Sequence, residues 1–282
     1  MWAAPRNLGA VSRQYSDKQE YSMHLLHGLK EWWQERIIRH SPIADGEWLR
    51  AFHYLSSLQR LSPQEKERLK RLAILFLHYK SLEGVGELHV TTSMRLHIAL
   101  QACLPILNLG LDWYRGWVSV LIYPGAFSKE RSETDEYGVV HQGRASLSGE
   151  SWQRGPVILS WDDALHRGDL DGHNVVIHEF AHKLDMQNGR ANGFPPLHPG
   201  MSAKKWAEVF NRAYADFNLR LQEPEPIPID PYAATSAGEF FAVFTEVFFE
   251  RPIIIHQYYP EVYDLLVNFY RQNPLGSLKT PA

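Results

Sequence analysis

The residues best suited to chemistry lie together between positions 174 and 185, in a stretch that contains the pattern His-Glu-x-x-His. His178 and His182 are four residues apart, so on a helix their imidazoles lie one above the other on the same face. Glu179 projects beside that pair, where a carboxylate can reach a water molecule bound to a metal. Zinc-dependent hydrolysis requires neutral nitrogen ligands, an open coordination position and a neighbouring base, so the pattern predicts a hydrolytic zinc site.

The sequence around this pattern predicts a buried helix. Outside the pattern, most positions from 175 to 184 are apolar, as expected for a helix packed inside a domain. Cap-type residues (Asp171, Gly172 and Asn174) precede the stretch, and Gly189 follows it as a stop signal. The alternative is a chance pair in a chain with 14 histidines. Burying two imidazoles and a carboxylate without a charge partner is costly, however, and a metal ion removes that cost.

The third metal ligand is less clear from the local sequence. Zinc hydrolases usually use three protein ligands and leave the fourth position to water. A third histidine six residues after the second, as in metzincins, is excluded because position 188 is Asn. Asp185 lies three residues beyond His182 on the same helix face, and its short side chain suits a hydrogen bond to a ligand imidazole. The remaining option is a glutamate on a later helix.

A later apolar stretch, residues 232–249, carries two such carboxylates. Glu239 and Glu246 are seven residues apart and therefore lie on one helix face. Ser236 and Glu239 also fit a capping box, which is a structural alternative for Glu239. Glu246 has no comparable local explanation and indicates a polar partner on the facing helix. Either histidine of the pattern would be such a partner, through the ring nitrogen that does not bind the metal.

Several separated motifs make the chain similar to the Mlc titration factor A family of zinc metallopeptidases. Coverage runs from about Leu61 to Leu275, and the matching stretches are residues 103–107, 121–124, 155–161, 172–189, 230–234 and 239–243. The resemblance implies that one Zn2+ per chain is bound by His178, His182 and Glu239. It also implies that Glu179 is the general base and that Tyr232 lies near the metal.

The position of Tyr232, seven residues before Glu239, also resembles the catalytic domain of anthrax lethal factor. A phenol at that place can donate a hydrogen bond to the oxyanion that forms as water attacks an amide. In this interpretation Asp185 and Glu246 orient the ligand imidazoles. Without the resemblance, Tyr232 would be interpreted as a structural aromatic residue in the turn after Pro231.

The resemblance implies two functions from different classes. The first is a peptidase of aminopeptidase type, with a peptide or protein as its substrate. The family is also associated with binding Mlc, a transcriptional repressor of sugar-uptake genes, which implies a link to the regulation of sugar uptake. A regulatory binding protein that sequesters this repressor, with peptidase activity secondary, is therefore the alternative function.

Composition excludes several other classes of protein. The chain has 282 residues, of which 44% are hydrophobic and 22% charged, as in an ordinary globular protein. Its net charge of -3 favours neither nucleic acid nor an anionic membrane as a direct partner. No run approaches 18 consecutive apolar residues, so no membrane-spanning helix is expected. The single cysteine, Cys103, allows no disulfide within the chain, and the expected location is the cytoplasm.

The elements that must position these residues predict an α+β fold that is mainly helical. A small mixed sheet, with strands expected at 117–123, 139–146 and 157–161, precedes the metal helix, and the Glu-bearing helix follows it. A peptide substrate is expected to add to one of these strands. The expected organisation is a flexible tail at 1–20, N-terminal helices at 21–60, a zincin-like metallopeptidase domain at 61–275 and a disordered tail at 276–282.

Overall fold

The computed structural model describes residues 28–125, 133–134, 140–141, 155–165, 170–224 and 227–277. The chain divides into two compact units, of which the first ends at Pro42 and the second spans Ile43–Ala282. The first unit contributes a helix over residues 28–39. The predicted tail at 1–20 lies outside the described residues.

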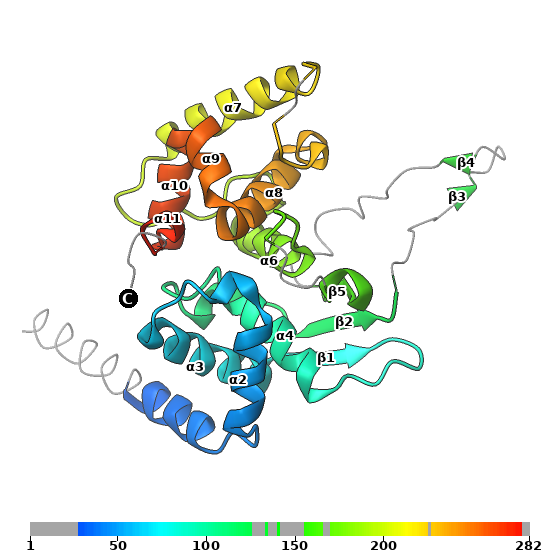
Figure 1. The fold of residues 1–282 in the computed structure, drawn as a ribbon, viewed down its shortest axis with the longest axis vertical. Coiled ribbons are helices and arrows are strands. Elements are labelled where there is room, and N and C mark those ends of the chain that lie inside the picture. Colours follow the sequence, from blue (N-terminus) through cyan, green and yellow to red (C-terminus); the bar gives the residue numbers. More distant parts are fainter. Residues whose placement is uncertain are drawn as a thin grey trace, which may run out of the picture. The chain divides into compact units, whose positions relative to one another are not determined.

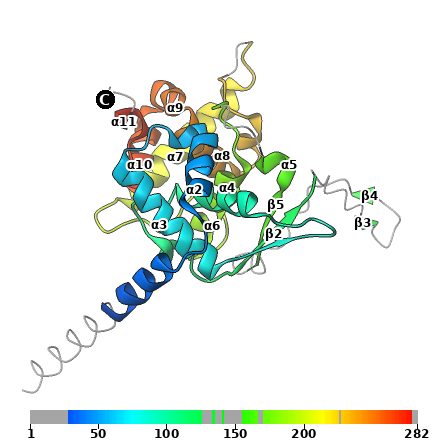
Figure 2. The same ribbon diagram turned by 60° about the horizontal axis from the view of Figure 1, so that its bottom comes forward.

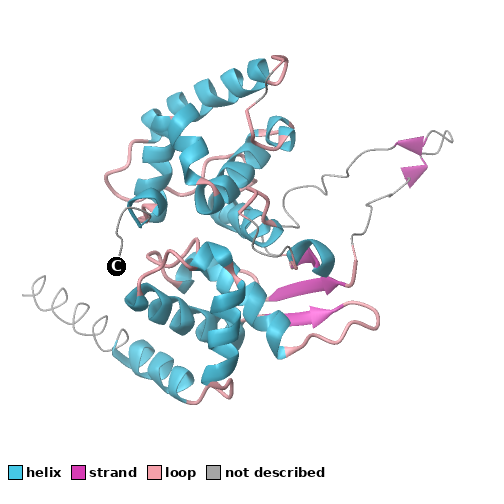
Figure 3. Ribbon diagram, in the orientation of Figure 1, coloured by secondary structure: helices cyan, strands magenta, loops and turns pink. Residues whose placement is uncertain are grey.

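The second unit begins earlier than the predicted domain start at residue 61. The cause is α2 (Asp45–Tyr54), which packs against α4 (Thr92–Cys103) and buries Trp48. The unit is mainly helical, as predicted (Figure 3). Its other helices are α3 (Pro63–Tyr79), α5 (Trp161–Ala164), α6 (Val175–Asp185), α7 (Ala203–Arg220), α8 (Ala237–Glu250), α9 (Pro252–Tyr258), α10 (Pro260–Tyr270) and α11 (Pro274–Ser277). The last of these helices includes residues 276 and 277, where the sequence predicted the start of a disordered tail.

The main sheet has three described strands, in the order β1 (Ser81–Gly84), β2 (Ser119–Tyr123), β5 (Val157–Ser160). All three run parallel rather than mixed as predicted, because neighbouring parallel strands are joined by crossovers, and α4 lies in the crossover from β1 to β2. The sequence did not predict β1, whose four residues, Ser-Leu-Glu-Gly, show no apolar run. A second, antiparallel pair joins β3 (Glu133–Thr134) to β4 (Val140–His141). Most of the strand predicted at 139–146 lies outside the described residues.

The centre of this unit is α6, which contacts α8, α4 and β5 (Figure 1, Figure 2). Five of its apolar residues are fully buried: Val176, Ile177, Phe180, Ala181 and Leu184. The ring of Phe180 meets those of Phe76, Tyr114 and Trp117 at centroid distances of 5.1 to 5.6 Å. Packing on several sides fixes both the position and the rotation of α6, and therefore the face that carries the histidines. Among the described residues, no helix combines the length and the apolarity that crossing a membrane requires.

Candidate metal centre

The helix that carries the two histidines, α6, begins after one of the cap-type residues noted in the sequence. Asn174 is its N-cap, and the side-chain Oδ1 of this residue accepts a hydrogen bond from the backbone N–H of Ile177 at 2.9 Å. The helix then runs without interruption through His178 and His182, whose ring centroids are 4.8 Å apart. The i, i+4 spacing therefore brings the two imidazoles together on one face, as predicted.

The glutamate helix, α8, begins at a second cap. The hydroxyl of Ser236 accepts a hydrogen bond from the backbone N–H of Glu239 at 3.2 Å, which is half of the capping box. The carboxylate of Glu239 does not complete that box, because its Oε2 lies against both imidazoles of α6. Capping thus explains Ser236 but not the position of the Glu239 side chain.

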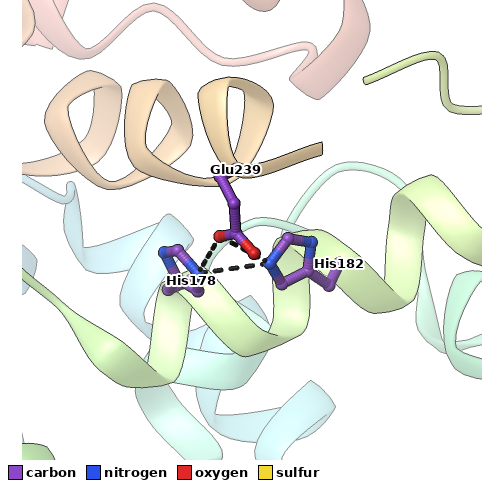
Figure 4. A group of neighbouring side chains, drawn as sticks. All are labelled: His178, His182 and Glu239. Carbon is purple, nitrogen blue, oxygen red and sulfur yellow. Dashed lines mark hydrogen bonds and ion pairs between the residues drawn. The ribbon is translucent and has the colours of Figure 1, made fainter. Parts of the chain in front are cut away.

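Three potential ligand atoms converge between α6 and α8 (Figure 4). Nε2 of His178 lies 2.9 Å from Oε2 of Glu239 and 3.2 Å from Nε2 of His182. The third pair, Nε2 of His182 and Oε2 of Glu239, is 3.2 Å apart. Donor atoms bound at about 2.0–2.1 Å to one ion in a tetrahedral arrangement lie about 3.3 Å from one another. The three atoms therefore have the spacing expected of ligands to one tetrahedrally coordinated metal ion.

The charges around these atoms also fit a cation. Burial lowers the pKa of His178, but hydrogen bonds to Glu239 and Glu246 outweigh this effect and raise the pKa to about 10. Burial raises the pKa of Glu239, but its hydrogen bonds to His178 and His182 dominate and hold the pKa far below its usual range. Both directions mean that the carboxylates favour a positive charge at this point. The side chains are 12% exposed for each histidine and 22% for Glu239, so the centre is largely buried but not closed to solvent.

Glu246 lies at the opposite ring nitrogen of His178, Nδ1, away from the cluster of three ligand atoms. Its Oε1 is 2.7 Å from Nδ1 of His178, and its Oε2 accepts a hydrogen bond from the backbone N–H of Asn174. Of the two histidines that the sequence allowed as partners, the structure brings Glu246 to His178. A carboxylate that accepts from Nδ1–H leaves the lone pair of Nε2 directed at the metal position.

Asp185 does not occupy the predicted position against an imidazole. Its two carboxylate oxygens accept hydrogen bonds from the backbone N–H groups of Gly193 and Phe194, at 2.7 and 2.9 Å. Nδ1 of His182 is buried and has no hydrogen-bond partner among the described residues. Asp185 bonds to the loop instead of to His182 because the tight loop after α6 brings the backbone N–H groups of Gly193 and Phe194 to its carboxylate. Asp185 therefore fixes the loop and makes no hydrogen bond to His182.

The two side chains expected to act on the substrate lie beside the cluster. Glu179 follows His178 on α6, is partly exposed, and its negative charge acts on His178 and Lys183. Tyr232 lies in the 3-10 turn Pro231–Ala234, whose start is capped by Asp230. The ring centroid of Tyr232 is 6.1 Å from that of His178. The ring of Tyr232 thus lies beside that of His178, and Glu179 is the next residue after His178 on α6.

Sequence reasoning missed two buried polar residues near the site. Glu250 and Gln101 both accept hydrogen bonds from the side-chain amide of Asn174. The signal for Glu250 was present, because it lies four residues after Glu246 on the same face of α8. Gln101 gave no signal, since a single amide in the apolar helix α4 carries no pattern.

Comparison with known proteins gives one family and several long matches. The family described as Glucose-regulated metallo-peptidase M90 matches residues 29–271. A protein named Mlc titration factor A from Klebsiella pneumoniae (strain 342) is 37% identical over 250 residues, which is 88% of this chain and 94% of the relative. The protein of the same name from Salmonella agona (strain SL483) is 40% identical, over 80% of this chain and 86% of the relative. The one from Pectobacterium atrosepticum is 38% identical, over 79% of this chain and 85% of the relative.

Proposed function

The chain belongs to the glucose-regulated metallo-peptidase M90 family, and we propose that it is a zinc-dependent peptidase of aminopeptidase type. The observation that carries the proposal is the convergence of His178, His182 and Glu239, whose ligand atoms are 2.9 to 3.2 Å apart. This donor set suits zinc, since two imidazoles and one carboxylate leave a fourth position for water or substrate.

The side chains around the donor set have complementary roles in peptide hydrolysis. A zinc ion held by His178, His182 and Glu239 would supply Lewis acidity, which would make water more acidic and polarise the carbonyl of the substrate. The carboxylate of Glu179 takes a proton from the attacking water and passes it to the nitrogen of the leaving amine. The phenol of Tyr232 donates a hydrogen bond to the oxyanion. Glu246 keeps the proton of His178 on Nδ1, which holds Nε2 available as a ligand.

The substrate backbone pairs with the edge of the main sheet. Among the described strands, β5 pairs only with β2, so its other edge offers backbone groups to a peptide. This strand also contacts α6, and Nζ of Lys183 on α6 donates to the carbonyl of Gly155 just before the strand, at 2.8 Å.

Cleavage at the amino terminus is tested by comparing an alanine anilide with its N-acetylated form. Equal turnover of the two substrates would argue for internal cleavage.

Metal content is the experiment that tests the proposed function. Elemental analysis of protein purified without added metal is expected to give about one zinc per chain in the wild type. His182→Ala removes one of three ligands and is expected to lose most of that zinc. A folded wild-type protein without metal would contradict the proposal, and the three side chains would then form a buried polar cluster.

A second candidate function is favoured by the name of the relatives, Mlc titration factor A. We propose that this chain also binds a transcriptional repressor of the Mlc type, which requires both proteins to be in the cytoplasm. Binding of purified Mlc to zinc-free Glu179→Gln protein separates the two functions. Full affinity would mean that binding does not depend on the peptidase site, whereas no binding by any form of the chain would contradict this second function.

A further inference from the structure

A buried polar junction lies at the start of α6, one step further from the metal position than Glu246. Its members come from three elements: Gln101 from α4, Asn174 from the N-cap of α6, and Glu246 and Glu250 from α8. Their exposed fractions are 3%, 7%, 6% and 5%, respectively. Polar groups buried to this degree must be hydrogen-bonded to one another, and these are.

Asn174 is the centre of the junction because each polar group of its side chain is used. Its Oδ1 caps α6, while its Nδ2 donates to Oε1 of Gln101 at 2.7 Å and to Oε1 of Glu250 at 2.9 Å. An amide meets this need, since it offers an acceptor on one side and two N–H donors on the other. Gln101 is fixed in turn, because its Nε2 donates to the carbonyl of His97 and leaves Oε1 for Asn174.

Glu250 holds the chain that leads into α6. Besides Asn174, its carboxylate accepts a hydrogen bond from the backbone N–H of Gly172 at 3.1 Å. Glu246, one turn earlier on α8, accepts from the backbone N–H of Asn174. The two carboxylates therefore fix residues 172–174 against α8 at three separate groups.

The carboxylate of Glu246 connects this buried polar junction to His178, next to the metal position. Oε2 of Glu246 is bonded to the N–H of Asn174, and Oε1 is 2.7 Å from Nδ1 of His178. Because a carboxylate is planar and rigid, a displacement of Asn174 changes the direction in which Oε1 meets the imidazole. The hydrogen-bonding partners of metal-bound histidines set the orientation and basicity of the ring.

We propose that Asn174, held by Glu250 and Gln101, is a positioning residue that sets the metal affinity of the site by fixing Glu246 against His178. This inference rests on the proposed function, since it requires a metal on His178. Asn174 itself touches neither the metal position nor the substrate.

Asn174→Asp is the variant that tests the role. Aspartate has the same shape and is an equally good N-cap, so the start of α6 is preserved. The oxygen that replaces Nδ2 faces the oxygens of Gln101 and Glu250, so two hydrogen bonds become repulsive contacts. We expect zinc affinity, measured by competition with a chelator, to fall about tenfold or more. The visible spectrum of the cobalt-substituted protein is expected to change as well, since it reports the ligand geometry.

A double variant separates positioning from general destabilisation. Glu250→Gln alone places an amide against the amide of Asn174, and it should also weaken zinc binding. In the double variant Asn174→Asp/Glu250→Gln, the roles of hydrogen-bond donor at position 174 and acceptor at position 250 are exchanged. The new amide at position 250 donates to the new carboxylate at position 174, while its oxygen still accepts from the N–H of Gly172. Zinc affinity is therefore expected to recover in part, and losses that simply add would overturn the inference.

Ser202→Ala is the matched control. Ser202 caps α7, which supplies none of the ligands, by accepting a hydrogen bond from the N–H of Lys205. This substitution should lower the thermal stability of the metal-free protein without changing zinc affinity. If Ser202→Ala lost as much zinc affinity as Asn174→Asp, the loss at Asn174 would be explained by general instability, and the inference would be overturned. A wild type without zinc would overturn the proposed function as well, whereas zinc bound equally by all variants would overturn this inference alone.

Discussion

Gly193 permits the closest approach between the loop after α6 and the start of α8. Its φ is +75°, and a Cβ added there would lie 2.5 Å from the carbonyl oxygen of Ala237. Ala237 is the first residue of α8, two residues before Glu239. The N–H of Gly193 donates to Asp185, and its carbonyl accepts from Nε1 of Trp206 at 3.0 Å. Gly193→Ala therefore inserts a methyl group between two anchored segments.

The size of the effect follows from this geometry. Restoring an ordinary contact of 3.4 Å requires the loop and α8 to separate by about 0.9 Å. Such overpacking costs about 1–3 kcal/mol, and a side chain in the left-handed region costs about 1–2 kcal/mol more. The free energy of unfolding should thus fall by about 3 kcal/mol, which lowers the Tm of a protein of this size by about 6–12 °C. Glu239 would move by a comparable distance, and metal sites tolerate only about 0.5 Å.

Gly200→Ala is the control for the backbone term. Gly200 also has a positive φ, +92°, but an added Cβ there meets nothing within 4 Å. This variant should lose about 1–2 kcal/mol of stability and keep the zinc affinity of the wild type. Gly193→Ala should bind zinc at least tenfold more weakly in a chelator competition assay. Equal zinc affinities and equal Tm values for the two variants would refute the argument that this contact positions Glu239.

Three further predictions concern single groups. Glu179→Gln should keep zinc but lose about 100-fold or more in kcat, and retained activity would refute its role as the base. Tyr232→Phe should lower kcat by about 10- to 100-fold with little change in KM, whereas a loss confined to KM would assign it to substrate binding. Burial raises the pKa of Glu250 to about 7; hydrogen bonds from Asn174 and Gly172 oppose this rise, and the charges of Asp171 and Glu246 add to it. The charge of Glu250 in turn raises the pKa of Arg60, which burial lowers. Because the folded state then holds a proton that the unfolded state releases, stability should fall by about 3 kcal/mol as pH rises from about 4.5 to 7. Urea unfolding of the metal-free protein measures this slope, which should be smaller in Glu250→Gln; an unchanged slope would assign it to other groups.

The sequence predicts those parts of the site that depend on helix geometry. His178 and His182 share a face because they are four residues apart, and the caps at Asn174 and Ser236 mark where α6 and α8 begin. The resemblance to the Mlc titration factor A family, carried by separated motifs, is confirmed by the long matches to its members. Periodicity and local signals sufficed for these features because neighbouring residues determine them.

The contacts that the sequence did not predict join residues distant along the chain. Glu250 meets Asn174 across 76 positions, and Gln101 meets Asn174 across 73. No local pattern states which helices will be neighbours, so these partners could not be assigned. Asp185 shows a different reason. Its spacing suited a bond to His182, but the loop returned the N–H groups of Gly193 and Phe194 to the same carboxylate. Short β1 and the parallel order of the sheet depend likewise on tertiary packing.

The buried carboxylates at the two ends of α6 are not explained by stability. Burial raises the pKa of Asp185 to about 6 and that of Glu250 to about 7. A raised pKa means that the charged form is disfavoured in the folded protein, so near neutral pH both groups oppose folding relative to their exposed state. Apolar packing between α6 and α8 would stabilise the fold without them, but it does not fix rotation or distance to the precision that a metal site needs. Asp185 sets the loop against the start of α8, and Glu250 sets the start of α6 against the end of α8. Their common consequence is a fixed distance between the helix that carries His178 and His182 and the helix that carries Glu239, and positioning therefore accounts for charges that stability does not.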